Sequence, residues 1–186
     1  MILPILAYGS PVLKRRCKEI NSNYSNIDLL IDNMFETMYA AHGVGLAAPQ
    51  IGKDIRLFII DTTPFSKEEE EEFTPIKKIF INPSIIRESG KVELFNEGCL
   101  SIPDIREDVS RKTNIVIEYL DERFDLRKES YKGINARVIQ HEYDHVEGIL
   151  FVDKISSLRK RMIKSKLTNI SKGNIEVDYR MSFPIK

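Results

Sequence analysis

The chain has 186 residues, 42% of them hydrophobic and 30% charged, which is typical of a soluble globular protein. Its 28 basic and 28 acidic side chains cancel, so no overall charge favours DNA or a membrane as a partner. It has two cysteines, no recognisable signal peptide and no apolar run near the roughly 20 residues of a membrane span, so we expect a reduced compartment, the cytosol of a simple cell.

The amino-terminal half predicts one helix followed by short strands. Apolar residues recur with helical spacing over 25–41, where Ser25 or Asn26 could cap the first turn. Two glycines then end the helix and open a loop-like stretch at 42–52. Strands are expected at 56–61, 78–86 and 91–98, and a solvated loop is expected at the acidic run 66–73.

The carboxy-terminal half predicts two strands and two helices. Residues 114–120 and 122–130 could pair around a turn at 121–123. Helices are expected at 134–147 and 157–170, and the tail at 171–186 shows no helical pattern. These elements favour a single α+β domain over residues 1–186, in which short antiparallel or mixed strands surround the helix at 134–147, with one helix before the strands and one at the C-terminal end.

The sequence QHEYDH, at residues 140–145, places two histidines one helical turn apart. His141 and His145 can bind the same metal ion, and Glu142 lies where it can accept a proton from water. At about 100° per residue, these three side chains share a sector of about 100° with Ile134, Val138 and Ile149, so they face the protein interior. We therefore expect a central metal-binding helix, with a chance match of the motif as the alternative.

Two histidines need a third ligand, and the sequence leaves two kinds of candidate. The extended protease pattern requires a histidine at position 151, which is phenylalanine here, although Gly148 matches that pattern. The nominal acidic candidates downstream are Glu147, Asp153, Glu176 and Asp178. Cys99, at the end of an expected strand, is the stronger candidate, because Cys–His–His with one open position is a known catalytic arrangement. A thiolate also suits iron, cobalt or nickel.

The stretch GVGLAAPQ, at residues 43–50, is rich in small side chains that let the backbone approach another element or a substrate. The Gln50 amide could donate to an oxyanion that develops on a carbonyl group. An ordinary turn with Gln50 at the surface is the alternative. A phosphate loop is excluded because no lysine followed by serine or threonine comes after the glycines.

Taken together, GVGLAAPQ, EGCLS and QHEYDH resemble the three signature stretches of peptide deformylases, in the same order. The resemblance implies a bacterial, cytoplasmic, metal-dependent hydrolase that removes the formyl group from the N-terminal formylmethionine of nascent proteins and releases formate. It also implies that Cys99, His141 and His145 bind one divalent ion, with Fe²⁺ favoured and Zn²⁺, Ni²⁺ or Co²⁺ able to substitute. Glu142 would be the general base and then the acid.

The same resemblance implies how the substrate is held. Gln50 and the Leu100 N–H would stabilise the oxyanion, and Gly45 would contact the substrate near the reacting centre. The loop at Gly45 and Leu46 would exclude acyl groups larger than formyl.

The implied pocket for the methionine side chain is lined by Val44, Phe95, Ile134 and Val138, with the His141 ring as part of its wall. The aliphatic stem of Arg137 could line this pocket while its charged head reaches solvent. Arg106 resembles a family arginine on the peptide-binding side.

Residues 158–168 carry five basic side chains, at positions 159, 160, 161, 164 and 166. A solvated helix face is the ordinary interpretation of this pattern, and docking on ribosomal RNA, as the family's C-terminal helix does in some bacteria, is the functional one. Two other classes of protein stay open: a zinc endopeptidase that uses a downstream acid in place of Cys99, and a non-enzymatic metal- or RNA-binding module.

Overall fold

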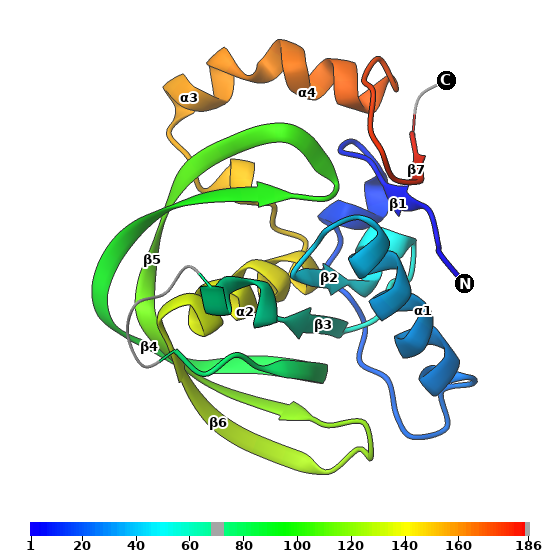
Figure 1. The fold of residues 1–186 in the computed structure, drawn as a ribbon, viewed down its shortest axis with the longest axis vertical. Coiled ribbons are helices and arrows are strands. Elements are labelled where there is room, and N and C mark those ends of the chain that lie inside the picture. The colour runs from blue at the N-terminus through cyan, green and yellow to red at the C-terminus, as the bar shows by residue number, and fades with distance from the viewer. Residues whose placement is uncertain (68–72, 185–186) are drawn as a thin grey trace.

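A five-stranded antiparallel sheet is the main sheet of the computed structural model, which describes residues 1–67 and 73–184. Its strands follow the order β2-β3-β4-β5-β6. They are β2 (Gly45–Ala47), β3 (Leu57–Asp61), β4 (Lys77–Cys99), β5 (Ile102–Leu120) and β6 (Leu126–Lys132). A second sheet pairs β1 (Ile5–Leu6) in parallel with β7 (Met181–Ser182), as Figure 1 shows. Most of the acidic run expected as a loop lies outside the described residues.

Helices precede and follow the long strands. The α-helices are α1 (Ile27–Ala40), α2 (Gly133–Val146), α3 (Ser157–Met162) and α4 (Lys164–Ser171). Short 3₁₀ helices are η1 (Pro11–Lys14), η2 (Ala48–Ile51), η3 (Thr63–Lys67) and η4 (Phe151–Asp153). The mixed α+β class predicted from the sequence is confirmed. No helix in the described part of the chain combines the length and the apolar character needed to cross a membrane.

The long hairpin of β4 and β5 was only partly predicted. The two strands expected at 78–86 and 91–98 are one strand, whose register shifts at several bulges, including one between Ser89 and Val92. The segment 102–113, the first part of β5, was not predicted at all. Every second side chain from Ile105 to Arg111 is buried there, but two of those buried residues are charged. The buried charges interrupt the apolar alternation by which a strand is recognised.

The predicted helices at 25–41 and 134–147 agree closely with α1 and α2. Asn26 precedes α1 in a left-handed conformation, and its side chain makes no capping hydrogen bond. The single helix expected at 157–170 is wrong. Helix α3 ends before Ile163, where φ is −90° and ψ is −1°, and a separate helix, α4, begins after this residue. The loop expected at 42–52 is also wrong in part, because β2 pairs with β3.

Helix α2 packs against the sheet through apolar side chains. Ala136, Val138 and Ile139 belong to a buried cluster with Phe58 of β3 and Phe80 of β4. In Figure 1, α2 lies between the curved β4–β5 hairpin and strands β2 and β3. This position brings one face of α2 against the end of β4, where the candidate site forms.

Candidate metal centre and substrate cavity

Three predicted ligands lie together in the structure. Cys99, His141 and His145 each offer one ligand atom, and these atoms lie within 4.8 Å of one another. The Cys99 Sγ is 3.2 Å from the His145 Nε2. Cys99 is the last residue of β4, and the histidines are one turn apart on the buried face of α2. A sulfur and two imidazoles in this arrangement can hold one metal ion.

Glu97 orients one of the two imidazoles. Its Oε2 lies 2.9 Å from the His141 Nδ1, and its side chain is only 4% exposed. The carboxylate also accepts hydrogen bonds from Arg111 and Arg137. If the Nδ1–H donates to Glu97, the Nε2 of His141 keeps its lone pair for a metal, which is the usual arrangement of a histidine ligand.

Burial alone would raise the pKa of Glu97, but Arg111 and His141 outweigh burial and lower that pKa far below its usual range. The sequence interpretation missed Glu97, although it lies within the quoted EGCLS stretch. The available signal was chemical: a buried histidine ligand needs a partner for its second nitrogen, and a carboxylate two residues before Cys99 could supply it.

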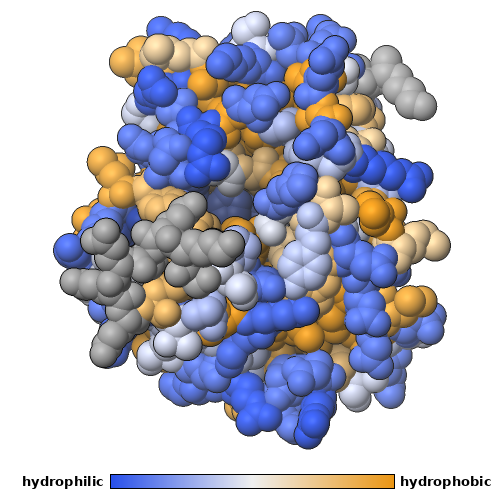
Figure 2. Space-filling view, in the orientation of Figure 1, coloured by the Kyte–Doolittle hydropathy of each residue, from blue (hydrophilic) through white to orange (hydrophobic). Residues whose placement is uncertain are grey.

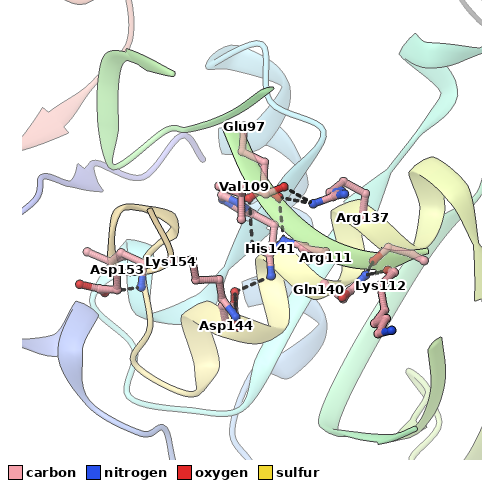
Figure 3. A network of polar contacts seen from close by, with 12 residues as sticks. Glu97, Val109, Arg111, Lys112, Arg137, Gln140, His141, Asp144, Asp153 and Lys154 are labelled. Atoms are coloured by element: carbon pink, nitrogen blue, oxygen red, sulfur yellow. Dashed lines mark hydrogen bonds and ion pairs between the residues drawn. The ribbon is translucent and has the colours of Figure 1, made fainter. Parts of the chain in front are cut away.

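A wider set of ion pairs holds Glu97 in place. The Arg111 Nη1 lies 2.7 Å from Asp144 Oδ2, and Lys154 Nζ lies 3.2 Å from the same oxygen. Figure 3 shows this network running from Glu97 on β4 through Arg111 on β5 to Asp144 on α2. The three elements that carry the candidate ligands and their supports are therefore tied together by buried charge pairs, which are strongly destabilised when one partner is lost.

Glu142 is buried beside the three candidate ligands. It is 4% exposed, and its Oε2 has no hydrogen-bond partner among the described residues. Burial raises the pKa of Glu142 to about 7. Gly45 of β2 lies against this side chain, since a Cβ added there would be 2.7 Å from the Glu142 Cδ. An unsatisfied buried carboxylate oxygen next to three candidate metal ligands has the position and the chemistry that a general base needs.

The remaining candidate ligand, His145, is fully enclosed by the protein. Burial lowers the pKa of His145 well below its usual value, which favours the neutral imidazole. Its Nδ1 has no hydrogen-bond partner in the part of the chain that the structure describes. The Nε2 is the nitrogen that faces Cys99.

Gln50 reaches the same centre from η2. Its side chain is 1% exposed, so the surface alternative for this residue is wrong. The Oε1 accepts a hydrogen bond from the Ala47 N–H at 2.8 Å. That bond directs the Nε2 towards the Cys99 Sγ at 3.5 Å and the Ser101 Oγ at 3.3 Å. The amide is therefore oriented with its donor side towards the candidate metal centre.

A cavity of about 1000 Å³ opens onto this centre. Figure 2 shows the molecule hollowed near the middle of the face that is viewed there. Six of the residues predicted to contact substrate line the cavity, namely Val44, Gly45, Phe95, Arg106, Arg137 and Val138. Gln50, Leu100 and Glu142 line it as well.

Two predictions about this cavity were wrong. Ile134 is buried but does not line it, because the lining residues of α2 begin almost one turn later, at Arg137 and Val138. Arg137 does line it, but its charged head does not reach solvent. The side chain is 8% exposed, and its guanidinium donates to Glu97, to the Val109 carbonyl and to the Glu93 carbonyl.

Several lining residues were not found from the sequence. They include His42, Phe65, Asp104 and the C-terminal residues Glu176, Val177, Asp178 and Tyr179. The C-terminal segment showed no periodicity that would have pointed to a wall of a cavity. Arg106, by contrast, was predicted, and its guanidinium donates to the side chain and carbonyl of Asn96.

Comparison with known proteins identifies the family. A family model described as polypeptide deformylase matches residues 2–161. The chain belongs to the peptide deformylase family. It is 57% identical over 190 residues to a peptide deformylase from Christiangramia forsetii, covering 99% of this chain and 97% of the relative. A peptide deformylase from Flavobacterium psychrophilum is 56% identical, covering 97% of this chain and 96% of the relative.

Solved deformylase structures share the fold. A crystal structure of a peptide deformylase from Legionella pneumophila superposes with a TM-score of 0.80 at 35% identity, covering 94% of this chain and 98% of that one. The chain is thus a metal-dependent hydrolase that removes the formyl group from nascent peptides. The zinc endopeptidase alternative is not supported, because the relatives and solved structures matched are peptide deformylases.

Proposed function

We propose that Cys99 Sγ, His141 Nε2 and His145 Nε2 hold the single metal ion of this peptide deformylase. The convergence of the three atoms within 4.8 Å supports this assignment, as does the bond between Glu97 and the opposite nitrogen of His141. We propose Fe²⁺ as the ion used in the cell, with Zn²⁺, Ni²⁺ or Co²⁺ able to replace it, since thiolate and imidazole ligands accept all four. When bound, the ion would supply a Lewis acid that lowers the pKa of water towards about 7.

Glu142 moves the proton in this scheme. Its unpartnered Oε2 accepts a proton from the attacking water and later delivers it to the α-amino group that leaves. Burial raises the pKa of Glu142 to about 7, which suits both halves of this task near neutral pH. A cation beside it would favour the ionised form, which is the form needed to start the reaction.

Two donors stabilise the negative charge that develops on the formyl oxygen. We assign them to the Gln50 Nε2 and to the backbone N–H of Leu100. The Gln50 side chain is already oriented by the Ala47 N–H, so it needs little reorganisation during the reaction. Loss of one such donor typically lowers the rate about 10²- to 10³-fold.

The cavity selects the substrate by shape. We propose that the methionine side chain lies against Val44, Phe95, Val138 and the aliphatic stem of Arg137, with the His141 ring completing the wall. Gly45 packs directly on Glu142, and we propose that this contact limits the reacting end to a formyl group. Arg106, which is exposed at the cavity, contacts the peptide beyond methionine.

One observation carries these assignments: three candidate ligand atoms lie within 4.8 Å of one another, beside a buried carboxylate oxygen that has no partner among the described residues. The test is a pair of variants assayed for formate release from a formyl-Met peptide. Glu142→Gln should keep the metal and lose activity. Cys99→Ala should lose both. Retained activity in Glu142→Gln would overturn the role of the base, and retained metal in Cys99→Ala would overturn the ligand set.

We also propose that the basic segment 158–168 docks on ribosomal RNA, in the bacterial cytoplasm. Arg159 pairs with Glu107 and Lys160 with Asp153, so these two charges are already engaged. Arg161, Lys164 and Lys166 have no ion-pair partner among the described residues and are exposed. Changing these three to glutamine should lower the affinity for the ribosome and make that affinity less sensitive to salt concentration. Formate release from a free peptide should be unchanged. Unchanged ribosome affinity would refute docking through this segment.

A further inference from the structure

The two-residue turn of Leu100 and Ser101 joins β4 to β5 directly after Cys99. Cys99 pairs with Ile102 across this hairpin. Within the described residues, the Leu100 N–H has no hydrogen-bond acceptor, whereas the carbonyl oxygens of both turn residues are bound. The turn therefore leaves its backbone N–H groups, including that of Leu100, without an acceptor among the described residues, while both of its carbonyl oxygens and the Ser101 Oγ are held by the protein.

The turn is held by segments that are far apart in the sequence. The Tyr8 N–H donates to the Ser101 carbonyl at 2.8 Å, and the Tyr179 hydroxyl donates to the Leu100 carbonyl at 2.8 Å. The Leu100 side chain packs over Gly43, where an added Cβ would lie 2.7 Å from its Cδ1. Leu100 and Tyr179 also pack against the same apolar cluster that includes the buried face of α1.

Tyr179 is itself fixed by the small parallel sheet that follows it. The Ile5 N–H donates to the Arg180 carbonyl at 2.9 Å, and the Ala7 N–H donates to the Ser182 carbonyl at 2.9 Å. In Figure 1, β1 and β7 lie side by side at the end of the molecule where the β4–β5 hairpin closes. The N-terminal segment that anchors β7 continues directly to Tyr8, so both bonds to the turn come from one paired unit.

This arrangement restrains the backbone of Leu100. The N–H and the carbonyl of one residue are related by only two torsions, φ and ψ, so fixing the carbonyl limits the direction of the N–H. Burial is the largest of the effects that raise the pKa of Tyr179, and the hydroxyl therefore stays protonated and donates. The match to the family model ends at residue 161, so Tyr179 lies in a part of the chain beyond it.

We propose that Tyr179 is a positioning residue of the deformylation reaction: by binding the Leu100 carbonyl, it orients the Leu100 N–H towards the formyl oxygen. This inference rests on the oxyanion role proposed above for the Leu100 N–H. It predicts that the C-terminal segment affects the turnover step rather than only the stability of the fold.

The test is Tyr179→Phe, which removes the hydroxyl and keeps the ring. Tyr8→Phe is the matched control, because Tyr8 contacts the turn through its backbone N–H, which the substitution leaves in place. Both variants are purified with metal, and kcat, KM, metal content and the urea midpoint are measured on a formyl-Met peptide. The ¹⁵N order parameter of the Leu100 amide gives a readout that does not depend on activity.

We expect kcat of Tyr179→Phe to fall about fivefold, the factor that corresponds to one neutral hydrogen bond, with KM within about twofold of the parent. The Leu100 order parameter should fall in this variant and stay unchanged in Tyr8→Phe. An unchanged kcat would overturn the inference, and so would a loss of metal or of stability that accounts for the lower activity. If Glu142→Gln is inactive while Tyr179→Phe is fully active, only the inference on Tyr179 fails and the proposed function stands.

Discussion

Replacing Gly45 with alanine should disable the enzyme through steric displacement of Glu142. A Cβ at position 45 would lie 2.7 Å from the Glu142 Cδ and 2.8 Å from its Cγ. The backbone of Gly45 cannot retreat easily, because it pairs with Ile60 in the sheet and the neighbouring Val44 carbonyl accepts a hydrogen bond from Asp61. The buried carboxylate must therefore move.

The expected size of the effect follows from this distance. Ordinary van der Waals contact begins at 3.4 Å, so the Glu142 carboxyl carbon must withdraw by about 0.7 Å from the new methyl group, and the Glu142 Oε1, which lies nearer still, must withdraw further. A misplacement of about 1 Å at a reacting group can cost about 10²-fold in rate. We therefore expect kcat for formate release to fall between about 10- and 100-fold in Gly45→Ala, with little change in metal content.

The assay is steady-state formate release from a formyl-Met peptide, with metal content measured on the same sample. Gly133→Ala is the control: a Cβ there meets nothing within 4 Å, but φ is +58°, so the variant should lose about 1 kcal/mol of stability and keep its kcat. The reasoning is refuted if Gly45→Ala binds metal normally and turns over within about twofold of the parent.

Three further predictions concern groups around the site and in the core. Glu97→Gln removes the charge that orients His141, so metal affinity should fall about 10- to 100-fold in competition with a chromophoric chelator; an affinity within about twofold of the parent would contradict this. Burial raises the pKa of the Cys17 thiol to about 12, so at pH 8 only about one thiol in 10⁴ is ionised, and mass spectrometry should find Cys17 unmodified by iodoacetamide in the folded chain and modified in denaturant. Burial would raise the pKa of Asp153, but Lys14 and other donors outweigh it and lower that pKa. The ionised Asp153 therefore stabilises the fold at any pH above its unfolded-state pKa of about 3.9, and this stabilisation is lost as the pH falls through the lowered pKa of the folded state. The difference in urea midpoint between the parent and Asp153→Asn should therefore be smaller at pH 3 than at pH 7. A difference in urea midpoint that stays the same from pH 7 to pH 3 would show that ionised Asp153 does not stabilise the fold.

The centre of the site could be predicted from the sequence, because it depends on the spacing of residues within one helix and on which side chains can bind a metal ion. The positions of His141, Glu142 and His145 on one face of α2 follow from the helical period alone. Cys99 followed from the need for a third ligand of suitable chemistry. The small residues before Gln50 indicated a close approach of the backbone, and Gly45 indeed packs on Glu142.

The surroundings of that centre depended on contacts that join distant parts of the chain. Glu97 lies 44 residues before the histidine it orients, and Tyr179 lies 79 residues after the carbonyl it binds. Neither relation has a period or a spacing that a sequence pattern could reveal. The first part of β5, which carries Arg111, was missed for the same reason. A buried arginine cannot be told from an exposed one in the sequence until its ion-pair partners, Glu97 and Asp144, are known. The sequence alone therefore determined the candidate ligands and the candidate base, whose spacing is set by a single helix and by ligand chemistry. Only the tertiary structure decided which buried partners hold those groups in place, because that depends on how the sheet, α2 and the two chain ends pack against one another.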